Sequence, residues 1–237
     1  MKKWIYRIVF VVSLCVFGYS AYNLWDIYSQ KQQVATQTKQ LEKKVIKKKR
    51  ENKVVKNVLE PDWAALQAEN QDIVGWIYVP GCDISFPVMQ SKDNEYYLNH
   101  TVSGEYNNRG SIFLDANAQF QDDNSIIYGH SVEGGGMFTL LKKYCDEDFF
   151  KSHPVFYLLT PGANFNCHVF TFAKTTDDSV FYTTSFGDYR QETLDSMKQS
   201  STYFNDLVNT DQKFVSLSTC DLDLSLIHIS EPTRRSY

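Results

Sequence analysis

Two segments of the chain end in side chains that could do covalent chemistry. NSIIYGH closes on His130 and opens into the loop SVEGGGMF, and KFVSLSTC closes on Cys220. Both are short apolar runs of strand type, so each reactive side chain is expected at a strand end, where two ends can meet at the rim of a barrel. An imidazole beside a cysteine favours the nucleophilic thiolate, and the imidazolium can protonate a leaving amine.

Three other histidines could take the place of His130. His153 precedes a proline and is expected in a loop, and His168 lies in the middle of an apolar run. His100 follows YYLN, which indicates a helical turn. The pattern favours His130 with Cys220 as an acyl-transfer pair.

The five cysteines give no sign of a disulfide framework or a metal site. Their number is odd and no C-x-x-C pair occurs. Cys167 and His168 are adjacent, and neighbours on a strand point to opposite faces. We therefore expect no zinc site, and we expect Cys82, Cys145 and Cys167 to be packing or turn residues.

The net charge of −4 is unevenly distributed. Residues 1–58 hold 13 Lys+Arg and 3 Asp+Glu, a balance of +10, so the remainder carries −4 − 10 = −14. An acidic folded part argues against nucleic-acid binding.

The N-terminal residues 1–28 predict a membrane anchor. Residues 8–24 carry no charge and are flanked by aromatic residues. Lys2, Lys3 and Arg7 place the N-terminus in the cytoplasm, so a single-pass protein of the cell membrane with an extracellular domain is expected. The alternative is a cleaved signal peptide, but residues 18–21 form a poor cleavage site.

Residues 29–58 form a basic stalk without Gly or Pro. Helix is expected there, and we interpret it as a solvated spacer, although the run KKKR at 47–50 could touch anionic envelope polymers or lipid headgroups. From residue 59 the character changes. Asp62 is expected to cap a helix over WAALQAEN.

Short apolar runs separated by turn residues then follow as far as residue 223. Strands this short and this regularly spaced indicate a mostly β, closed or nearly closed barrel. Helices are expected over residues 137–144 and 191–208. The runs are IVGWIYV, ISFPVMQ, GSIFLDA, NSIIYGH, PVFYLLT, NCHVFTFAK and KFVSLSTC.

The ordered motifs of residues 59–223 resemble the class B sortases, membrane-anchored cysteine transpeptidases of Gram-positive cell envelopes. The resemblance rests on DIVGWIYVPG, ISFPVMQSKDNEYYLNH and GSIFLD within 72–115, on NSIIYGHSVEGGGMF at 124–138 and on VSLSTCD at 215–221. It implies a sortase-type eight-stranded β-barrel with N-terminal helices and a helix before the cysteine strand.

The resemblance also implies roles for particular residues. Cys220 matches the nucleophile and His130 the catalytic histidine. Asn94, Leu98, Ser218 and Thr219 match positions near the substrate groove. The implied reaction cleaves a C-terminal sorting signal after Thr and transfers the acyl group to a cell-wall amine without a metal or cofactor. Its implied partners are surface proteins that bear a sorting signal and a cell-wall precursor.

The family pattern has a third catalytic residue, an arginine about ten residues beyond the cysteine. Ser230 occupies that distance here, and the arginines that follow Cys220 are Arg234 and Arg235. Residues 224–237 begin LSLIHISEPTR, which resembles a translated sequencing-library adaptor. We therefore expect 224–237 to be an artefact, the catalytic domain at 59–223 to be incomplete, and the last strand to be missing.

Two other functions remain open. If the tail is genuine, the missing arginine favours a catalytically inactive sortase-like binding module. A hydrolytic cysteine peptidase is the second alternative, because water can resolve any thioacyl enzyme. Only product analysis with an added amine separates transfer from hydrolysis.

Overall fold

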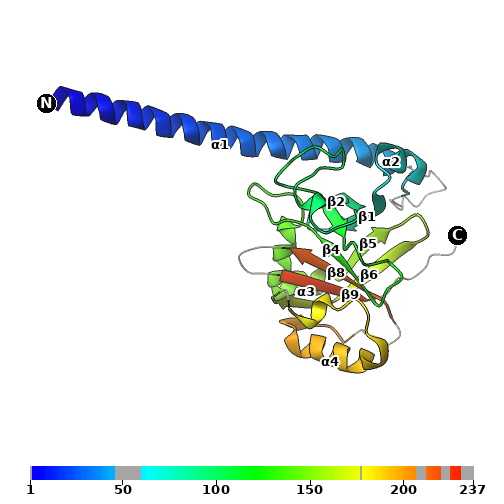
Figure 1. The fold of residues 1–237 in the computed structure, drawn as a ribbon. Helices are drawn as coiled ribbons and strands as arrows, with labels where there is room; N and C mark the ends of the chain where they lie inside the picture. Colours follow the sequence, from blue (N-terminus) through cyan, green and yellow to red (C-terminus); the bar gives the residue numbers. More distant parts are fainter. Residues whose placement is uncertain (1, 46–59, 177, 207–211, 220–224, 231–237) are drawn as a thin grey trace.

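The computed structural model describes residues 2–45, 60–176, 178–206, 212–219 and 225–230. Their strands join in one mixed sheet beneath a long N-terminal helix (Figure 1). The strands are β1 (Ile73–Val79), β2 (Ile84–Met89), β3 (Ile112–Leu114), β4 (Asn124–Tyr128), β5 (Val155–Leu159), β6 (Asn164–Lys174), β7 (Tyr203–Phe204), β8 (Phe214–Thr219) and β9 (Ser225–Ser230).

The sheet closes on itself. Its order is β5-β1-β2-β3-β4-β8-β9-β6-β7, and β5 also pairs with β6. Eight strands thus form a ring, and the short β7 extends from β6. β2 with β3 and β4 with β8 are parallel, whereas the other pairs are antiparallel. The predicted mostly β, eight-stranded barrel is confirmed.

Large apolar side chains from facing strands fill the inside of the ring. Ile77, Ile127, Phe156, Phe172 and Leu217 are all buried in one cluster. They come from five different strands, so burial of their apolar surface stabilises the ring as a unit. This packing gives the ends of β4 and β8 a fixed relative position.

The backbone of Ser225–Ser230 differs from the expectation that the last strand is missing. β9 pairs with β8 from Phe214↔Ser230 to Thr219↔Ser225, and on its other side with β6. The physical reason is that ladder hydrogen bonds use backbone groups, so any extended segment can fill the place between two strand edges. The origin of residues 224–237 as an adaptor stays a prediction.

The helices and 3₁₀ turns agree only in part with those predicted from the sequence. Asp62 caps α2 as expected, because its carboxylate accepts from the N–H of Ala65 at 3.1 Å. The helix expected over 137–144 is a 3₁₀ turn, η2, and the helix expected over 191–208 ends earlier as α4. The elements are α1 (Lys2–Val45), α2 (Trp63–Glu69), α3 (Glu147–Ser152), α4 (Arg190–Ser200), η1 (Tyr96–Leu98), η2 (Thr139–Cys145), η3 (Val180–Tyr182) and η4 (Gly187–Tyr189).

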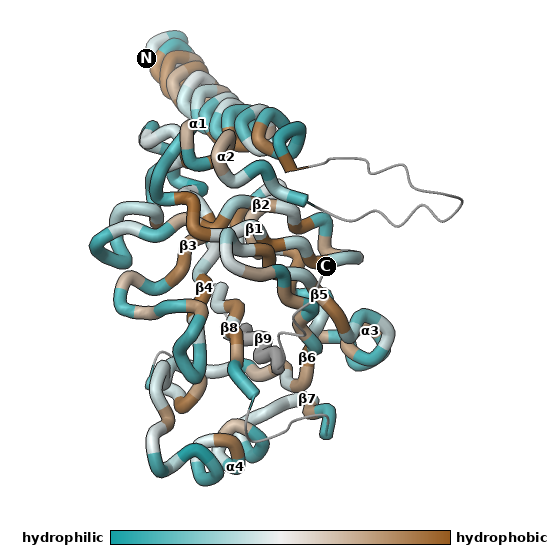
Figure 2. Tube along the Cα trace, turned by 90° about the vertical axis from the view of Figure 1, so that its right-hand side faces the viewer, coloured by the Kyte–Doolittle hydropathy of each residue, from teal (hydrophilic) through white to brown (hydrophobic). Residues whose placement is uncertain are grey.

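α1 joins the predicted anchor and stalk in one helix. Its N-terminal part projects away from the barrel and includes the apolar residues coloured brown in Figure 2. By length and composition this helix could cross a membrane. The interpretation of the stalk as a solvated spacer is wrong for its described part, because Leu41 and Val45 are buried beside Leu66 and Trp76. Residues 46–58 lie outside the described part.

Candidate active site

The two strands that carry the predicted catalytic residues are parallel neighbours. Their register runs from Asn124↔Phe214 to Tyr128↔Ser218, and the N–H of Gly129 donates to the carbonyl of Ser218 at 3.0 Å. His130 follows Tyr128 by two positions, and Cys220 follows Ser218 by two positions. Cys220 itself lies outside the described residues. The structure therefore places His130 at the end of β4 beside the end of β8.

The ring of His130 is fixed by a backbone carbonyl. Its Nε2 lies 2.7 Å from the carbonyl oxygen of Leu98. A carbonyl can only accept, so the ring donates and Nε2 carries a proton. This leaves Nδ1 as the ring nitrogen that can exchange a proton with a neighbour.

Gly129 allows the end of β4 to approach the ring of Phe138 closely. A Cβ at this position would lie 2.7 Å from a ring carbon of Phe138. The N–H of Phe138 also donates to the carbonyl of His130 at 3.0 Å. Only glycine fits between the strand end and this aromatic ring without displacing it.

Leu98 reaches the site through its backbone. It ends η1 and its side chain is exposed. Asp93 precedes η1, and its Oδ1 accepts from the N–H groups of Tyr96 at 2.8 Å and Glu95 at 2.9 Å. The bond from Tyr96, and to a smaller extent the bond from Glu95, holds the pKa of the Asp93 carboxyl below its ordinary value.

Asn94 uses both ends of its amide inside the protein. Its Nδ2 donates to Oδ2 of Asp115 at 2.8 Å, and its Oδ1 accepts from the N–H of Ala116 at 2.7 Å. Asp115 also accepts from the hydroxyl of Tyr128 at 3.2 Å. Asn94 thus ties the loop before η1 to the end of β3, next to the strand that leads to His130.

Ser218 and Thr219 lie on opposite faces of β8. The hydroxyl of Ser218 is 2.9 Å from that of Tyr182. Thr219 is buried on the same face as Leu217, and its Oγ1 has no hydrogen-bond partner in the described part of the protein. The structure therefore does not bring these two predicted groove residues to one surface.

Two tyrosines at this surface were missed from the sequence. The rings of Tyr128 and Tyr182 stack with centroids 6.5 Å apart and an angle of 13° between their planes. Tyr128 precedes the Gly-His pair, which was a usable signal. Tyr182 lies in η3, where no periodicity marks it.

The three histidines that the sequence offered as rivals to His130 lie elsewhere in the fold. His100 stacks on Tyr96 with centroids 4.1 Å apart, and His153 stacks on Phe149 with centroids 3.9 Å apart. His168 lies on β6 opposite Val155. None of the three directly follows β4 or β8, so the topology favours His130.

Cys82 and Cys167 are buried, as expected of packing residues, whereas Cys145 is exposed. Burial raises the pKa of Cys82 to about 11 and raises that of Cys167 as well. Such thiols stay protonated and unreactive near neutral pH. Within the described ranges, no group of three or more His, Cys, Asp or Glu side chains could hold a metal ion.

No arginine stands at the cysteine end of β9. Ser230 pairs with Phe214, the first residue of β8, so it lies at the far end from Thr219. Arg190 forms an ion pair with Asp123 at 2.7 Å, near the beginning of β4. Arg234 and Arg235 lie outside the described residues.

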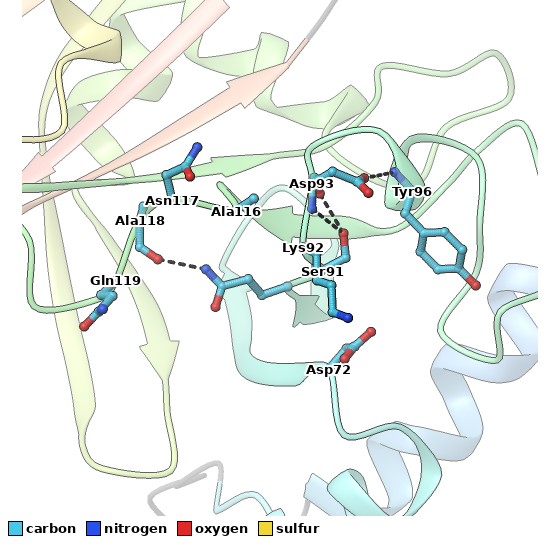
Figure 3. Close-up of a pocket in the computed structure, with 10 residues that line it drawn as sticks. Asp72, Ser91, Lys92, Asp93, Tyr96, Ala116, Asn117, Ala118 and Gln119 are labelled. Carbon is cyan, nitrogen blue, oxygen red and sulfur yellow. Dashed lines mark hydrogen bonds between the residues drawn. The ribbon is translucent and has the colours of Figure 1, made fainter.

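A polar depression of about 700 Å³ lies beside the site but does not contain His130 (Figure 3). Asp72, Lys92, Asp93 and Asn117 are among its lining residues. Two bonds of the Asp93 carboxylate are already made to backbone N–H groups. The segment that runs from the end of β2 through η1 lines the depression, and the same segment contacts His130 through the carbonyl of Leu98.

Comparison with known proteins agrees with this geometry. Residues 77–230 match the family model described as a sortase domain. The chain is 39% identical to a sortase B of Listeria monocytogenes over 67% of this chain and 66% of that protein. It is 31% identical to a sortase B of Staphylococcus aureus over 93% of this chain and 91% of that protein.

A solved structure shows the same fold. The crystal structure of sortase B from B. anthracis in complex with AAEK1 superposes with a TM-score of 0.75 at 32% identity. The match covers 90% of this chain and 100% of that chain. The likeness thus extends from the N-terminal helix through the barrel.

Proposed function

The chain belongs to the sortase family, in its class B branch, and from this we propose that it is a membrane-anchored cysteine transpeptidase. The proposed reaction cleaves a C-terminal sorting signal after Thr and transfers the acyl group to an amine of a cell-wall precursor. The observation that carries the proposal is the parallel register of β4 and β8, which ends at Tyr128↔Ser218. Neighbouring strands are about 4.8 Å apart, and we propose that the side chain two positions beyond Ser218 lies within reach of His130.

In the proposed first step, Nδ1 of His130 takes the proton of the Cys220 thiol. The thiolate attacks the carbonyl carbon of the Thr, and the C–N bond breaks as Nδ1 returns the proton to the leaving amine. In the second step an acceptor amine attacks the thioester, loses its proton to Nδ1 and releases the thiolate. The bond from Nε2 to Leu98 keeps the ring oriented in both steps.

Substrate groups near the reacting bond are proposed to contact the surface that carries Ser218, Tyr128 and Tyr182. Asn94 supports this surface through Asp115, and Leu98 supports it through its carbonyl. Thr219 would act by packing, since it faces the inside of the barrel.

We propose that residues 224–237 have replaced a natural last strand that bears the family's arginine. Such a guanidinium would stabilise the oxyanion of the tetrahedral intermediate. The segment of β9 contains no arginine. The chain as written is therefore expected to acylate slowly, and this absence favours an inactive binding module as the second candidate function.

We also propose that α1 crosses the membrane once, with its N-terminus in the cytoplasm and the barrel outside. The apolar stretch of α1 and the basic residues before it support this orientation.

The test is capture of the thioacyl enzyme by intact-mass spectrometry. The full chain in detergent micelles is mixed with peptides of Asn-Pro-x-Thr-Asn and Pro-x-Thr-Gly type, with and without an added amine. A slowly forming acyl adduct on Cys220 is expected, and Cys220→Ala should abolish it. His130→Ala should slow it by about 100-fold or more, and His168→Ala, the matched control on β6, should not.

Three results would count against the proposal. Cleavage that survives Cys220→Ala would mean another nucleophile. Failure to acylate by a version that carries the natural continuation after Asp223 would favour the binding module. Hydrolysis unchanged by added amine would favour the peptidase.

A further inference from the structure

The turn after His130 has an unusual backbone. Gly134, Gly135 and Gly136 have φ values of +77°, +79° and +96°, and Met137 follows at +47°. Glycine adopts such φ values without strain, whereas a non-glycine residue such as Met137 is uncommon there. Met137 at the end of the turn is thus held in this conformation by its surroundings.

Three successive carbonyls of the turn each accept from a cationic side chain. Arg109 Nη2 donates to the carbonyl of Glu133 at 2.5 Å, and Nη1 donates to that of Gly135 at 2.8 Å. Between them, Lys31 Nζ on α1 donates to the carbonyl of Gly134 at 2.5 Å. Charge-assisted hydrogen bonds of this kind are stronger than neutral ones.

Arg109 is the more deeply placed of the two cations. It is only 6% exposed, whereas Lys31 is exposed. Desolvation lowers the pKa of Arg109 from its ordinary value. In the ranges that the structure describes, no carboxylate forms an ion pair with it. The guanidinium is thus satisfied by carbonyls, so its planar fork serves as a bracket for the turn.

The segment that carries Arg109 is itself docked on α1. The buried Asn107 donates through Nδ2 to the carbonyl of Gln30 at 3.1 Å and to Oε1 of Gln33 at 2.6 Å. Its Oδ1 accepts from the N–H of Arg109 at 3.0 Å. A continuous set of contacts therefore leads from α1 through Asn107 and Arg109 to the turn.

The turn is also tied to His130. The N–H of Phe138 donates to the carbonyl of His130, so the two ends of the segment 130–138 are closed on each other. Met137 and Val34 of α1 line the same small cavity. Loosening the turn would release this side of the His130 backbone.

We propose that Arg109 and Lys31 are positioning residues that bracket the turn 133–135, so that the docked membrane helix orders the segment carrying His130. The inference rests on the proposed function for the role of His130, but not for the bracket itself. It gives the stalk part of α1 a role at the active site beyond tethering.

The test uses the full chain in micelles and two readouts. Hydrogen–deuterium exchange reports the order of the segment 130–138. The rate of iodoacetamide modification of the Cys220 peptide, followed by mass spectrometry, reports the thiol that His130 is proposed to activate. The variants are Arg109→Met, Arg109→Lys, Lys31→Met and Lys31→Arg, with Lys39→Met on the exposed side of α1 as control.

Arg109→Met is expected to raise exchange at Gly135 and Phe138 about tenfold and Lys31→Met about threefold. Lys31→Arg should keep exchange at the level of the parent chain. Arg109→Lys should give exchange between that of the parent chain and that of Arg109→Met, because one ammonium cannot bridge two carbonyls in the same geometry. Cys220 modification should fall toward the rate of His130→Ala in the same order. Lys39→Met should match the parent chain.

Unchanged exchange in both Arg109→Met and Lys31→Met would overturn the bracket. Raised exchange with parental Cys220 modification, where His130→Ala slows it, would overturn the positioning role. If His130→Ala does not change the rate of Cys220 modification, the proposed function fails. The exchange measurements alone then decide whether Arg109 and Lys31 hold the turn. Should Arg109→Met fail to fold, the exposed Lys31 pair of variants still decides the question.

Discussion

At the scale of single residues, the carbonyl that faces Nε2 of His130 decides which ring nitrogen carries a proton. The carbonyl of Leu98 fixes a proton on Nε2 at 2.7 Å. Leu98 is placed by η1, and η1 begins where the Asp93 carboxylate accepts two backbone N–H groups. The position of the histidine ring thus depends on a carboxylate that lies well before it in the sequence.

The cap at Asp93 predicts a dependence on pH. Its carboxyl pKa is lower in the folded chain than in the unfolded chain, so its stabilisation is present above the unfolded value and is lost as the pH falls through the folded value. Protection factors of the amides of 95–98 should therefore fall on acidification. In Asp93→Asn, whose amide oxygen can still accept but does not titrate, they should not change with pH. Asp188→Asn, at an exposed aspartate of η4, should behave as the parent, and a pH response retained in Asp93→Asn would contradict the role of the cap.

At the scale of elements, periodicity predicted most strands of the barrel but not the role of α1. Runs such as NSIIYGH and KFVSLSTC are short and rich in apolar residues, as expected of strands that are buried on both faces in a closed ring. In the stalk, Leu41 and Val45 stand among charged residues, so no apolar stripe is evident. Docking of this helix depends on polar contacts between residues far apart in sequence, which one sequence does not reveal.

Local backbone chemistry explains the misplaced elements. A helix was expected from Met137, but the positive φ of that residue ends the glycine turn and delays η2 to Thr139. α4 ends at Ser200 because Tyr203–Phe204 pairs with β6. Tertiary pairing here overrides helix propensity.

Docking of α1 predicts a measurable contribution to stability. Leu41 is 6% exposed and packs in the cluster of Leu66, Trp76 and Tyr97. Leu41→Ala should lower the free energy of unfolding of the full chain by about 2–4 kcal/mol, because it removes buried methyl groups and leaves a cavity. Denaturant unfolding in micelles measures this. Lys39→Ala should have little effect, and an equal midpoint for both variants would mean that the helix is not docked.

At the scale of the whole molecule, β9 decides whether the ring is closed. Its backbone bridges β8 and β6, yet its sequence supplies no arginine beside the end of β8. The barrel could be predicted from the strands before Cys220, and so could the pairing of strand ends at His130. The position of residues 225–230 in the sheet could not be predicted, because the backbone hydrogen bonds between strands can form with many different sequences.

The interpretation of residues 224–237 as an adaptor predicts how the natural gene continues after the codon of Asp223. A read of unfragmented source DNA across the codon of Asp223 should continue into an apolar strand that carries an arginine. A chain with that continuation should form the thioacyl enzyme faster than the chain as written, because it regains a donor to the oxyanion. A read that gives residues 224–237 followed by a stop codon would refute the interpretation and favour the binding module.

The proposed orientation in the membrane can be tested with the native cysteines. Cys145 is exposed on the barrel, Cys82 and Cys167 are buried, and Cys15 lies in the apolar stretch of α1. In a Cys220→Ala background, a membrane-impermeant maleimide should label intact cells at Cys145. A cysteine introduced by Lys3→Cys should react only after permeabilisation, because the basic N-terminus is expected in the cytoplasm. Labelling of that cysteine in intact cells would reverse the orientation, and a labelled product that lacks the first residues would show a cleaved signal peptide instead of an anchor.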